Sequence, residues 1–157
     1  MEFIALQPIR LNGEVALGEA LAELHSISHN QFGLDTDNYI GRTPQLNQWH
    51  NDWWGFYTNN RLMPQLQKAE NNGMRGELVA RIQALIDAVP DYFKGHQPIP
   101  SLLHGDLWNG NVAADLQGTP VIFDPAVYYG DAETDIAMSQ MFQPLGNAVY
   151  DVYYKHF

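Results

Sequence analysis

Apolar residues recur every third or fourth position in several parts of the chain, which is the spacing of one face of a helix. On this basis we predict helices over residues 14–26, 45–71, 76–89 and 131–142. Asp131 is suited to cap the start of the last one, and Asn72-Gly73 to end the second. The predicted inward positions are Leu17, Leu21, Leu24 and Ile27; Trp49, Trp53, Phe56, Leu62 and Leu66; Leu78, Ile82, Leu85 and Val89; and Ile136, Met138 and Met141.

The segments between these helices show turn and strand signals. Residues 30–43 are rich in glycine, asparagine and aspartate and are predicted to be loop. Residues 111–124 predict a hairpin, because two short apolar runs flank the turn residues 115–119. A short apolar run at residues 2–6 is a candidate edge strand. The expected fold is mainly α (α+β), with one central hairpin, in a single domain over residues 1–157.

Composition and charge narrow the class of protein. Apolar residues make up 45% and charged residues 17%, which favours a folded protein over a disordered one. The formal charge of −10 opposes binding to phosphate backbones, so we expect no nucleic-acid partner. The absence of cysteine excludes disulfides. Residues 1–8 resemble neither a signal peptide nor a membrane span, so we expect a cytoplasmic protein with no membrane partner.

The strongest candidate site is a motif with the form H-G-D-x-x-x-x-N, followed by an aspartate after an apolar strand. It comprises His104, Gly105, Asp106, Asn111 and Asp124. A carboxylate such as Asp106 can accept the proton of a substrate hydroxyl during phosphoryl transfer. The oxygens of Asn111 and Asp124 are the hard ligands that Mg²⁺ prefers, and the predicted hairpin would bring these two residues together. The alternative is that all three are ordinary turn and cap residues.

For the other candidate residues, a structural role such as packing or capping stands beside the functional one. His104 is expected to brace the motif through hydrogen bonds rather than to act as a base. His25 ends an apolar helix and is expected to be a packed or capping residue. Trp108 and Tyr128 are candidate substrate-binding residues, because flat aromatic rings stack on sugars and amines, but core packing explains them equally well.

The chain resembles the fructosamine/ketosamine-3-kinase family, within the aminoglycoside-phosphotransferase and protein-kinase-like superfamily. The stretches that carry the resemblance are HGDLWNGN, FDPAVYYGDAETDIAM, LGEALAELH and residues 32–69. The resemblance implies ATP-dependent phosphorylation of a sugar hydroxyl on a ketoamine, and a protein-kinase-like C-terminal lobe. A kinase for another small hydroxyl substrate, such as an aminoglycoside or an amino alcohol, is an alternative.

The family pattern also implies roles for individual residues. Asp106 corresponds to the catalytic base, and Asn111 and Asp124 correspond to the Mg²⁺ ligands. The backbone of Glu2, Phe3 and Ile4 corresponds to the hinge that binds adenine, within a hinge remnant at residues 1–8. Asp135 is expected to support the catalytic loop from behind.

The sequence departs from the family at its start. The family's small β-rich lobe, with its phosphate-covering loop and strand lysine, has no counterpart here, and the only lysines are Lys68, Lys94 and Lys155. We therefore expect an N-terminal lobe to be absent and activity to be impaired or lost. The alternative is a non-catalytic fragment that binds partners or forms a homodimer through the surface that this lobe would cover.

Overall fold

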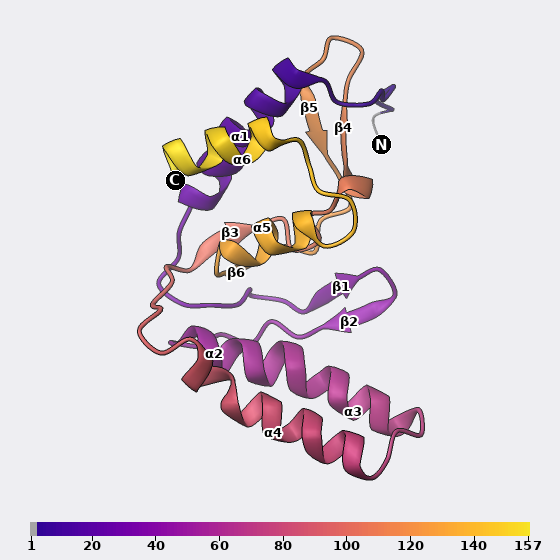
Figure 1. Cartoon of the computed structure of the whole chain (residues 1–157), viewed down its shortest axis with the longest axis vertical. Helices are drawn as coiled ribbons and strands as arrows, with labels where there is room; N and C mark the ends of the chain where they lie inside the picture. The colour runs from indigo at the N-terminus through magenta and orange to yellow at the C-terminus, as the bar shows by residue number, and fades with distance from the viewer. Residues whose placement is uncertain (1–2) are drawn as a thin grey trace.

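The computed structural model describes residues 3–157 and arranges their elements in three parts along the long axis of the molecule (Figure 1). The first part contains two helices and a hairpin: α1 (Leu11–Ser26), α6 (Asn147–His156), β4 (Val112–Ala114) and β5 (Pro120–Ile122). The middle part contains β3 (Ser101–Leu103), β6 (Tyr128–Gly130) and α5 (Glu133–Gln140).

The third part combines a hairpin with a pair of neighbouring helices (Figure 1). Its elements are β1 (Asn38–Ile40), β2 (Thr43–Gln45), α2 (Trp53–Tyr57), the π-helical turn η1 (Thr58–Leu62), α3 (Met63–Asn71) and α4 (Glu77–Tyr92). All three strand pairs, β1–β2, β3–β6 and β4–β5, are antiparallel. The expected mainly helical fold with a hairpin at residues 111–124 is confirmed, and β1–β2 is a second hairpin that the sequence did not predict.

The helix predicted over residues 45–71 begins only at Trp53. Asp52 is its N-cap, and its side chain accepts a hydrogen bond from the Gly55 amide at 2.7 Å. The preceding residues are extended, because Gln45 pairs with Asn38 in the β1–β2 hairpin. Residues 38–45 lie in regular strands joined by a turn, so the loop prediction for residues 30–43 was wrong at its end.

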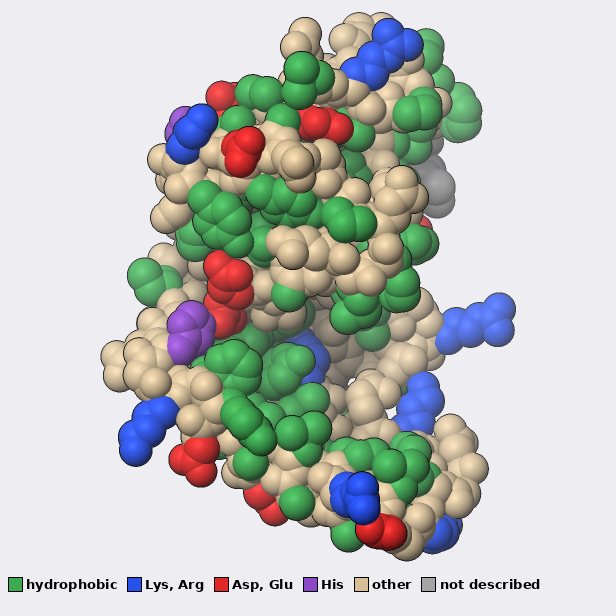
Figure 2. All heavy atoms as spheres, viewed as in Figure 1, with side chains coloured by type: hydrophobic (Ala, Val, Ile, Leu, Met, Phe, Trp, Pro, Cys, Tyr) green, Lys and Arg blue, Asp and Glu red, His purple; other side chains and the backbone are tan. Residues whose placement is uncertain are grey.

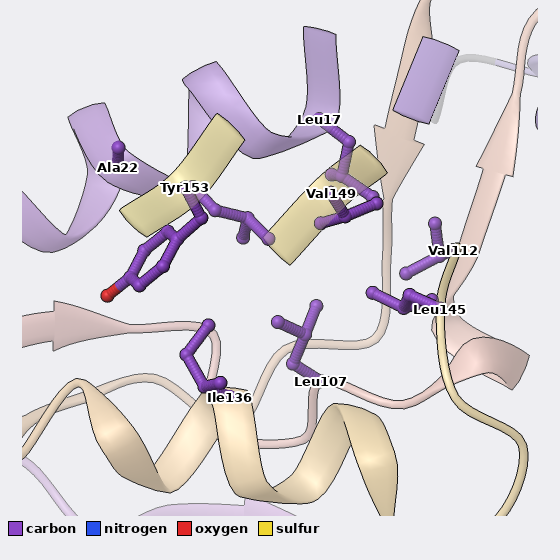
Figure 3. Close-up of a cluster of buried hydrophobic side chains, with 9 residues drawn as sticks. Leu17, Ala22, Leu107, Val112, Ile136, Leu145, Val149 and Tyr153 are labelled. Carbon is purple, nitrogen blue, oxygen red and sulfur yellow. The ribbon is translucent and has the colours of Figure 1, made fainter. Parts of the chain in front are cut away.

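Two clusters of buried apolar side chains form the core. The first joins α1, α6 and the hairpin, and contains Leu17, Leu21, Leu107, Val112, Ile136, Leu145, Val149 and Tyr153 among others (Figure 3). The second lies between the middle and third parts and contains Phe32, Trp53, Phe56, Leu103, Tyr128 and Ala132. The helices α1 and α6 pack closely because Gly18 has no side chain: a Cβ there would lie 2.6 Å from the Val149 carbonyl oxygen.

Several predicted inward positions prove to be exposed. Leu78 and Leu85 are 53% and 56% exposed, and the buried residue of α4 is Ile86, because α4 packs on α3 only along one narrow face. Met141 follows the end of α5 and is 65% exposed. Among residues 3–157, none of the helices combines the length and apolar character needed to cross a lipid bilayer.

Candidate active site

The candidate site lies on the motif loop, residues 104–111, which connects β3 to β4. Leu107 is fully buried and anchors the middle of the loop in the first core cluster, which also contains Ile136 of α5 and Val149 of α6 (Figure 3). Gly105 has φ +81°, and a Cβ there would overlap the Ala126 carbonyl oxygen, so the loop needs glycine at this position. The anchored leucine and the glycine turn leave Asp106 partly exposed beside the loop's own backbone.

Asp106 and Asn111 are in direct contact. The Asn111 side-chain amide donates to the Asp106 carbonyl oxygen at 2.9 Å and to its carboxylate Oδ2 at 3.3 Å. Asn111 is 6% exposed, and among the described residues no donor contacts its Oδ1. Its amide nitrogen therefore holds Asp106, while its oxygen remains available to a ligand.

The hairpin returns Asp124 to the same place. Val112 pairs with Ile122, and the Phe123 amide donates to the Asn111 carbonyl oxygen at 3.2 Å. Asp124 follows at once, with φ +52°, a left-handed conformation that residues other than glycine seldom adopt. The hairpin thus places Asp124 one residue after the backbone partner of Asn111, and the Asn111 side chain in turn contacts Asp106.

His104 braces the motif loop through both ring nitrogens. Its Nε2 donates to the Phe123 carbonyl oxygen at 3.0 Å, so the ring carries its proton there. Its Nδ1 is then free to accept a hydrogen bond from the Asp106 amide, at 3.3 Å. The ring connects the loop to the end of β5, and its committed nitrogens make it unsuitable as a general base.

Asp135, on α5, holds the loop from behind. Its carboxylate accepts hydrogen bonds from the backbone amides of His104 at 2.7 Å and Gly105 at 2.9 Å. His25 Nε2 lies 3.3 Å from the same carboxylate, and His25 Nδ1 lies 2.8 Å from the Tyr153 hydroxyl. His25 is fully buried, so it is a packed residue as expected, but its polar bonds to α5 and α6 were not foreseen.

The remaining predicted site residues lie apart from one another. Tyr128 is 2% exposed and lines a cavity, whereas Trp108 is 37% exposed and contacts Phe142. Of the predicted hinge residues, Glu2 lies outside the described residues, and Phe3 and Ile4 are exposed. The segment that follows them is fixed to β4, because Gln7 and Ala114 exchange backbone hydrogen bonds at 2.8 and 2.9 Å.

A cavity of about 530 Å³ lies next to the motif loop, between the middle and third parts of the molecule. It touches Gly105, and many apolar side chains border the hollow that Figure 2 shows. Its walls include Trp53, Trp54, Tyr57, Phe93, Tyr128 and Met138. This volume is in the range of small-molecule sites, about 300–1,000 Å³.

Arg61 lines the same cavity and was not predicted. Its guanidinium lies over the rings of Tyr128 at 4.1 Å and Phe56 at 4.6 Å, and it donates to the Asn47 side chain at 2.9 Å and to the Asn60 carbonyl oxygen at 3.1 Å. Burial lowers the pKa of Arg61. A single arginine in a polar segment carries no sequence signal, because two of its partners, Asn47 and Tyr128, lie in other segments of the chain.

Burial also acts on the acidic groups of the site. It raises the pKa of Asp106, and the nearby carboxylates of Asp135 and Asp124 add to that effect. The Asn111 hydrogen bond and the His104 ring oppose it. Burial raises the pKa of Tyr128 to about 12, so its phenol stays protonated at neutral pH. Among residues 3–157, no group of three histidine, aspartate or glutamate side chains could enclose a metal ion.

Comparison with known proteins identifies the family. The fructosamine kinase family profile matches residues 1–157. The chain is 41% identical to the protein-ribulosamine 3-kinase, chloroplastic, of Arabidopsis thaliana over 157 residues, covering 99% of this chain and 48% of that protein. It is 39% identical to the ketosamine-3-kinase of Mus musculus over 143 residues, covering 91% of this chain and 45% of that protein.

A solved structure agrees with these sequence matches. The crystal structure of a protein from Haemophilus somnus 129PT, assigned as a fructosamine-3-kinase, superposes with a TM-score of 0.89 at 32% identity. The match covers 99% of this chain and 52% of that one. The chain therefore belongs to the fructosamine kinase family, and it spans about half the length of the curated relatives it matches.

Proposed function

We propose that this chain is the catalytic half of an ATP-dependent kinase that phosphorylates a sugar hydroxyl on a ketoamine. The observation that carries the proposal is that Asn111 binds Asp106 through its side chain, while the hairpin returns the chain to the Asn111 backbone directly before Asp124. We further propose that the mainly helical fold is that of a protein-kinase-like C-terminal lobe. The family membership and the names of the relatives favour a ketoamine over an aminoglycoside or an amino alcohol.

In this proposal Asp106 is the group that accepts the hydroxyl proton. Its raised pKa improves it as a base, because a carboxylate nearer to the operating pH binds a transferred proton better. The Asn111 amide keeps the carboxylate in one orientation. Asp135 and His104 fix the loop backbone in advance, so little reorganisation is needed at the moment of reaction.

The residues at the site fit a magnesium ion. Asn111 Oδ1 and the exposed Asp124 carboxylate are hard oxygen donors without protein partners among the described residues, and they would hold the ion together with phosphate oxygens and water. When bound, Mg²⁺ neutralises the charge on the nucleotide's phosphates. Two protein ligands are too few for tight binding, so we expect the ion to bind well only with the nucleotide.

These 157 residues supply only part of what phosphoryl transfer requires. They include no glycine-rich loop followed by a strand lysine to orient the phosphates. We therefore expect transfer by this chain alone to be slow. A turnover of about 1–100 s⁻¹, typical of kinases, would show that other residues of this chain position the phosphates.

A single-turnover assay tests the proposal. The chain is kept in excess over the fructosyl adduct of a simple amine, with Mg²⁺ and ATP, and the phosphorylated adduct is quantified by mass spectrometry. We expect slow product formation that Asp106→Asn abolishes. The matched control is Asp151→Asn, an exposed carboxylate on α6, which should leave the rate unchanged. Equal rates for both variants would remove Asp106 from the chemistry.

Self-association is a second candidate function. Phe3, Ile4, Leu6 and Leu116 are 45–91% exposed near the hairpin β4–β5, and such apolar groups favour burial against another surface. A dimer mass by light scattering, lost in a Phe3→Ser/Leu6→Ser variant, would support this role. A concentration-independent monomer mass would rule it out.

A further inference from the structure

The cavity beside the motif loop has walls of unequal chemistry. On one side, α2 and the end of α4 contribute aromatic rings, with Trp54 stacked on Phe93 at a centroid distance of 4.8 Å and Trp53 5.2 Å from Tyr57. On the other side, the start of α5 contributes the carboxylates Asp131 and Glu133. A ligand held here would meet an apolar surface and an acidic edge at the same time.

The charged residues of the cavity differ in whether they already pair with other groups of the protein. Asp131 lies 2.7 Å from His96 Nε2 and accepts a hydrogen bond from the Glu133 amide at 3.1 Å. Glu133 is exposed, and no cation pairs with its carboxylate in the part of the chain that the structure describes. Glu133 is thus available to a positively charged ligand.

Arg61 does not offset this preference by recruiting an anion. It donates through both terminal nitrogens to the carbonyl oxygens of Leu46 and Asn60 and to the side-chain oxygen of Asn47. Its guanidinium face is covered by Phe56 and Tyr128. Arg61 therefore stabilises the cavity wall: its terminal nitrogens are bonded to the protein, and its Nε, which has no partner among the described residues, is buried and closed to an entering ligand. A carboxylate entering the cavity would meet the carboxylates of Asp131 and Glu133.

The position of the cavity links it to the reacting group. It touches Gly105, the residue directly before Asp106. In a ketoamine, the nitrogen and the reactive hydroxyl are separated by only a few bonds, and the secondary amine carries a positive charge at neutral pH. A sugar hydroxyl placed at Asp106 therefore puts the nitrogen, and whatever it carries, at the mouth of this cavity.

We infer that the cavity is a specificity site for the amine portion of the substrate. It binds the protonated nitrogen near Glu133 and an uncharged apolar substituent against Trp54 and Phe93, and it disfavours substituents that carry a carboxylate. This inference rests on the proposed function, because it takes the ligand to be a ketoamine. The aromatic wall contributes in two ways, by burial of apolar area and by attraction between its rings and the cation.

Calorimetric binding to the intact chain tests the inference with three fructosyl adducts: those of methylamine, benzylamine and phenylalanine. We expect the benzylamine adduct to bind about tenfold more tightly than the methylamine adduct, as burial of a phenyl group predicts. The phenylalanine adduct, which adds a carboxylate, should bind more weakly than the benzylamine adduct. Equal affinities for all three would overturn the inference.

Variants separate the two parts of the site. Trp54→Ala should remove the advantage of the benzylamine adduct and weaken the methylamine adduct by a smaller factor, through the lost attraction between ring and cation. Glu133→Gln should weaken both adducts by a similar factor, about fivefold for one lost charge contact. The matched controls are Tyr154→Ala and Glu19→Gln, which lie outside the cavity on α6 and α1 and should change neither affinity.

The controls also keep the outcome interpretable. Glu133 and Glu19 are both exposed, so their variants are expected to fold, and unchanged affinity in Glu133→Gln would contradict the inference even if Trp54→Ala unfolds. Failure of phosphoryl transfer would count against the proposed function, and the binding affinities would still test the role of the cavity. Transfer without any preference for the benzylamine adduct would count against the cavity's role alone.

Discussion

Asp135 ties the motif loop to the helical core, and replacing it with asparagine is the most informative single change. The carboxylate is 1% exposed and accepts two backbone amides, at 2.7 and 2.9 Å, beside His25 at 3.3 Å. Asparagine offers one acceptor oxygen. Its amide group would point hydrogen atoms at the second backbone amide or at His25, so at least one buried donor loses its partner.

The size of the effect follows from these contacts. A hydrogen bond to a charged group contributes about 1.5–3 kcal/mol, and an unsatisfied buried donor costs about 1–3 kcal/mol. One lost bond and one weakened bond therefore predict that Asp135→Asn lowers the free energy of unfolding by about 2–4 kcal/mol. This is a large share of the roughly 5–15 kcal/mol that stabilises a typical domain.

Urea unfolding followed by circular dichroism measures the change, and amide hydrogen exchange locates it. We expect the midpoint to fall by about 1–2 M, given slopes of about 1–3 kcal/mol/M in urea, and the amides of His104 and Gly105 to lose protection. Asp151→Asn, an exposed replacement of the same kind, should change stability by less than about 0.5 kcal/mol. A loss below about 1 kcal/mol for Asp135→Asn would refute the reasoning.

Three further predictions concern the site. Burial raises the pKa of Asp106, so its ionised form opposes folding at neutral pH, and Asp106→Asn should be at least as stable as the wild type in thermal melts at pH 7. Any gain in stability should disappear as the pH falls below the ordinary pKa range of aspartate, and a clearly less stable variant at pH 7 would contradict this prediction. Tyr128 holds its proton more tightly in the folded protein, so the stability of the wild type should decline between about pH 10 and 12. Tyr128→Phe should lose less stability between melts at pH 9 and 11, and an identical loss in both proteins would contradict this prediction. Gly105→Ala introduces a Cβ that overlaps the Ala126 carbonyl oxygen at a positive φ, so it should destabilise the chain by about 2–4 kcal/mol in urea unfolding, and a change within error would show that the loop can rearrange.

The sequence was most informative where local signals and function coincide. The hairpin at residues 111–124 was predicted from two apolar runs around a turn, and β4 and β5 lie within those bounds. Family membership was also predicted from the motifs, and the comparisons confirm it. The roles of Asp106, Asn111 and Asp124 remain predictions, although Asn111 contacts Asp106 and the hairpin returns to the Asn111 backbone directly before Asp124.

The errors occurred where distant contacts decide local structure. Residues 38–47 are held extended by polar bonds that no helical pattern shows: Asn38 donates to the Val127 carbonyl oxygen at 2.8 Å, and Gln45 to that of Ala126 at 3.0 Å. Helix α6 was not predicted, and its position depends on close packing against Gly18 of α1. The cavity was also beyond the sequence, since its walls come from segments around residues 53–61, 93 and 128–141.

The account as a whole depends on one cation held by Asn111 and Asp124 next to Asp106. Manganese substitutes for magnesium and broadens the NMR signals of nearby nuclei, and a 17.8 kDa chain gives resolved amide spectra. In the presence of a non-hydrolysable ATP analogue, the amide signals of these three residues should broaden together, at lower Mn²⁺ concentration than those of surface acids such as Asp151. Broadening that begins at the surface acids, or that reaches the three residues at clearly different concentrations, would contradict a common metal site.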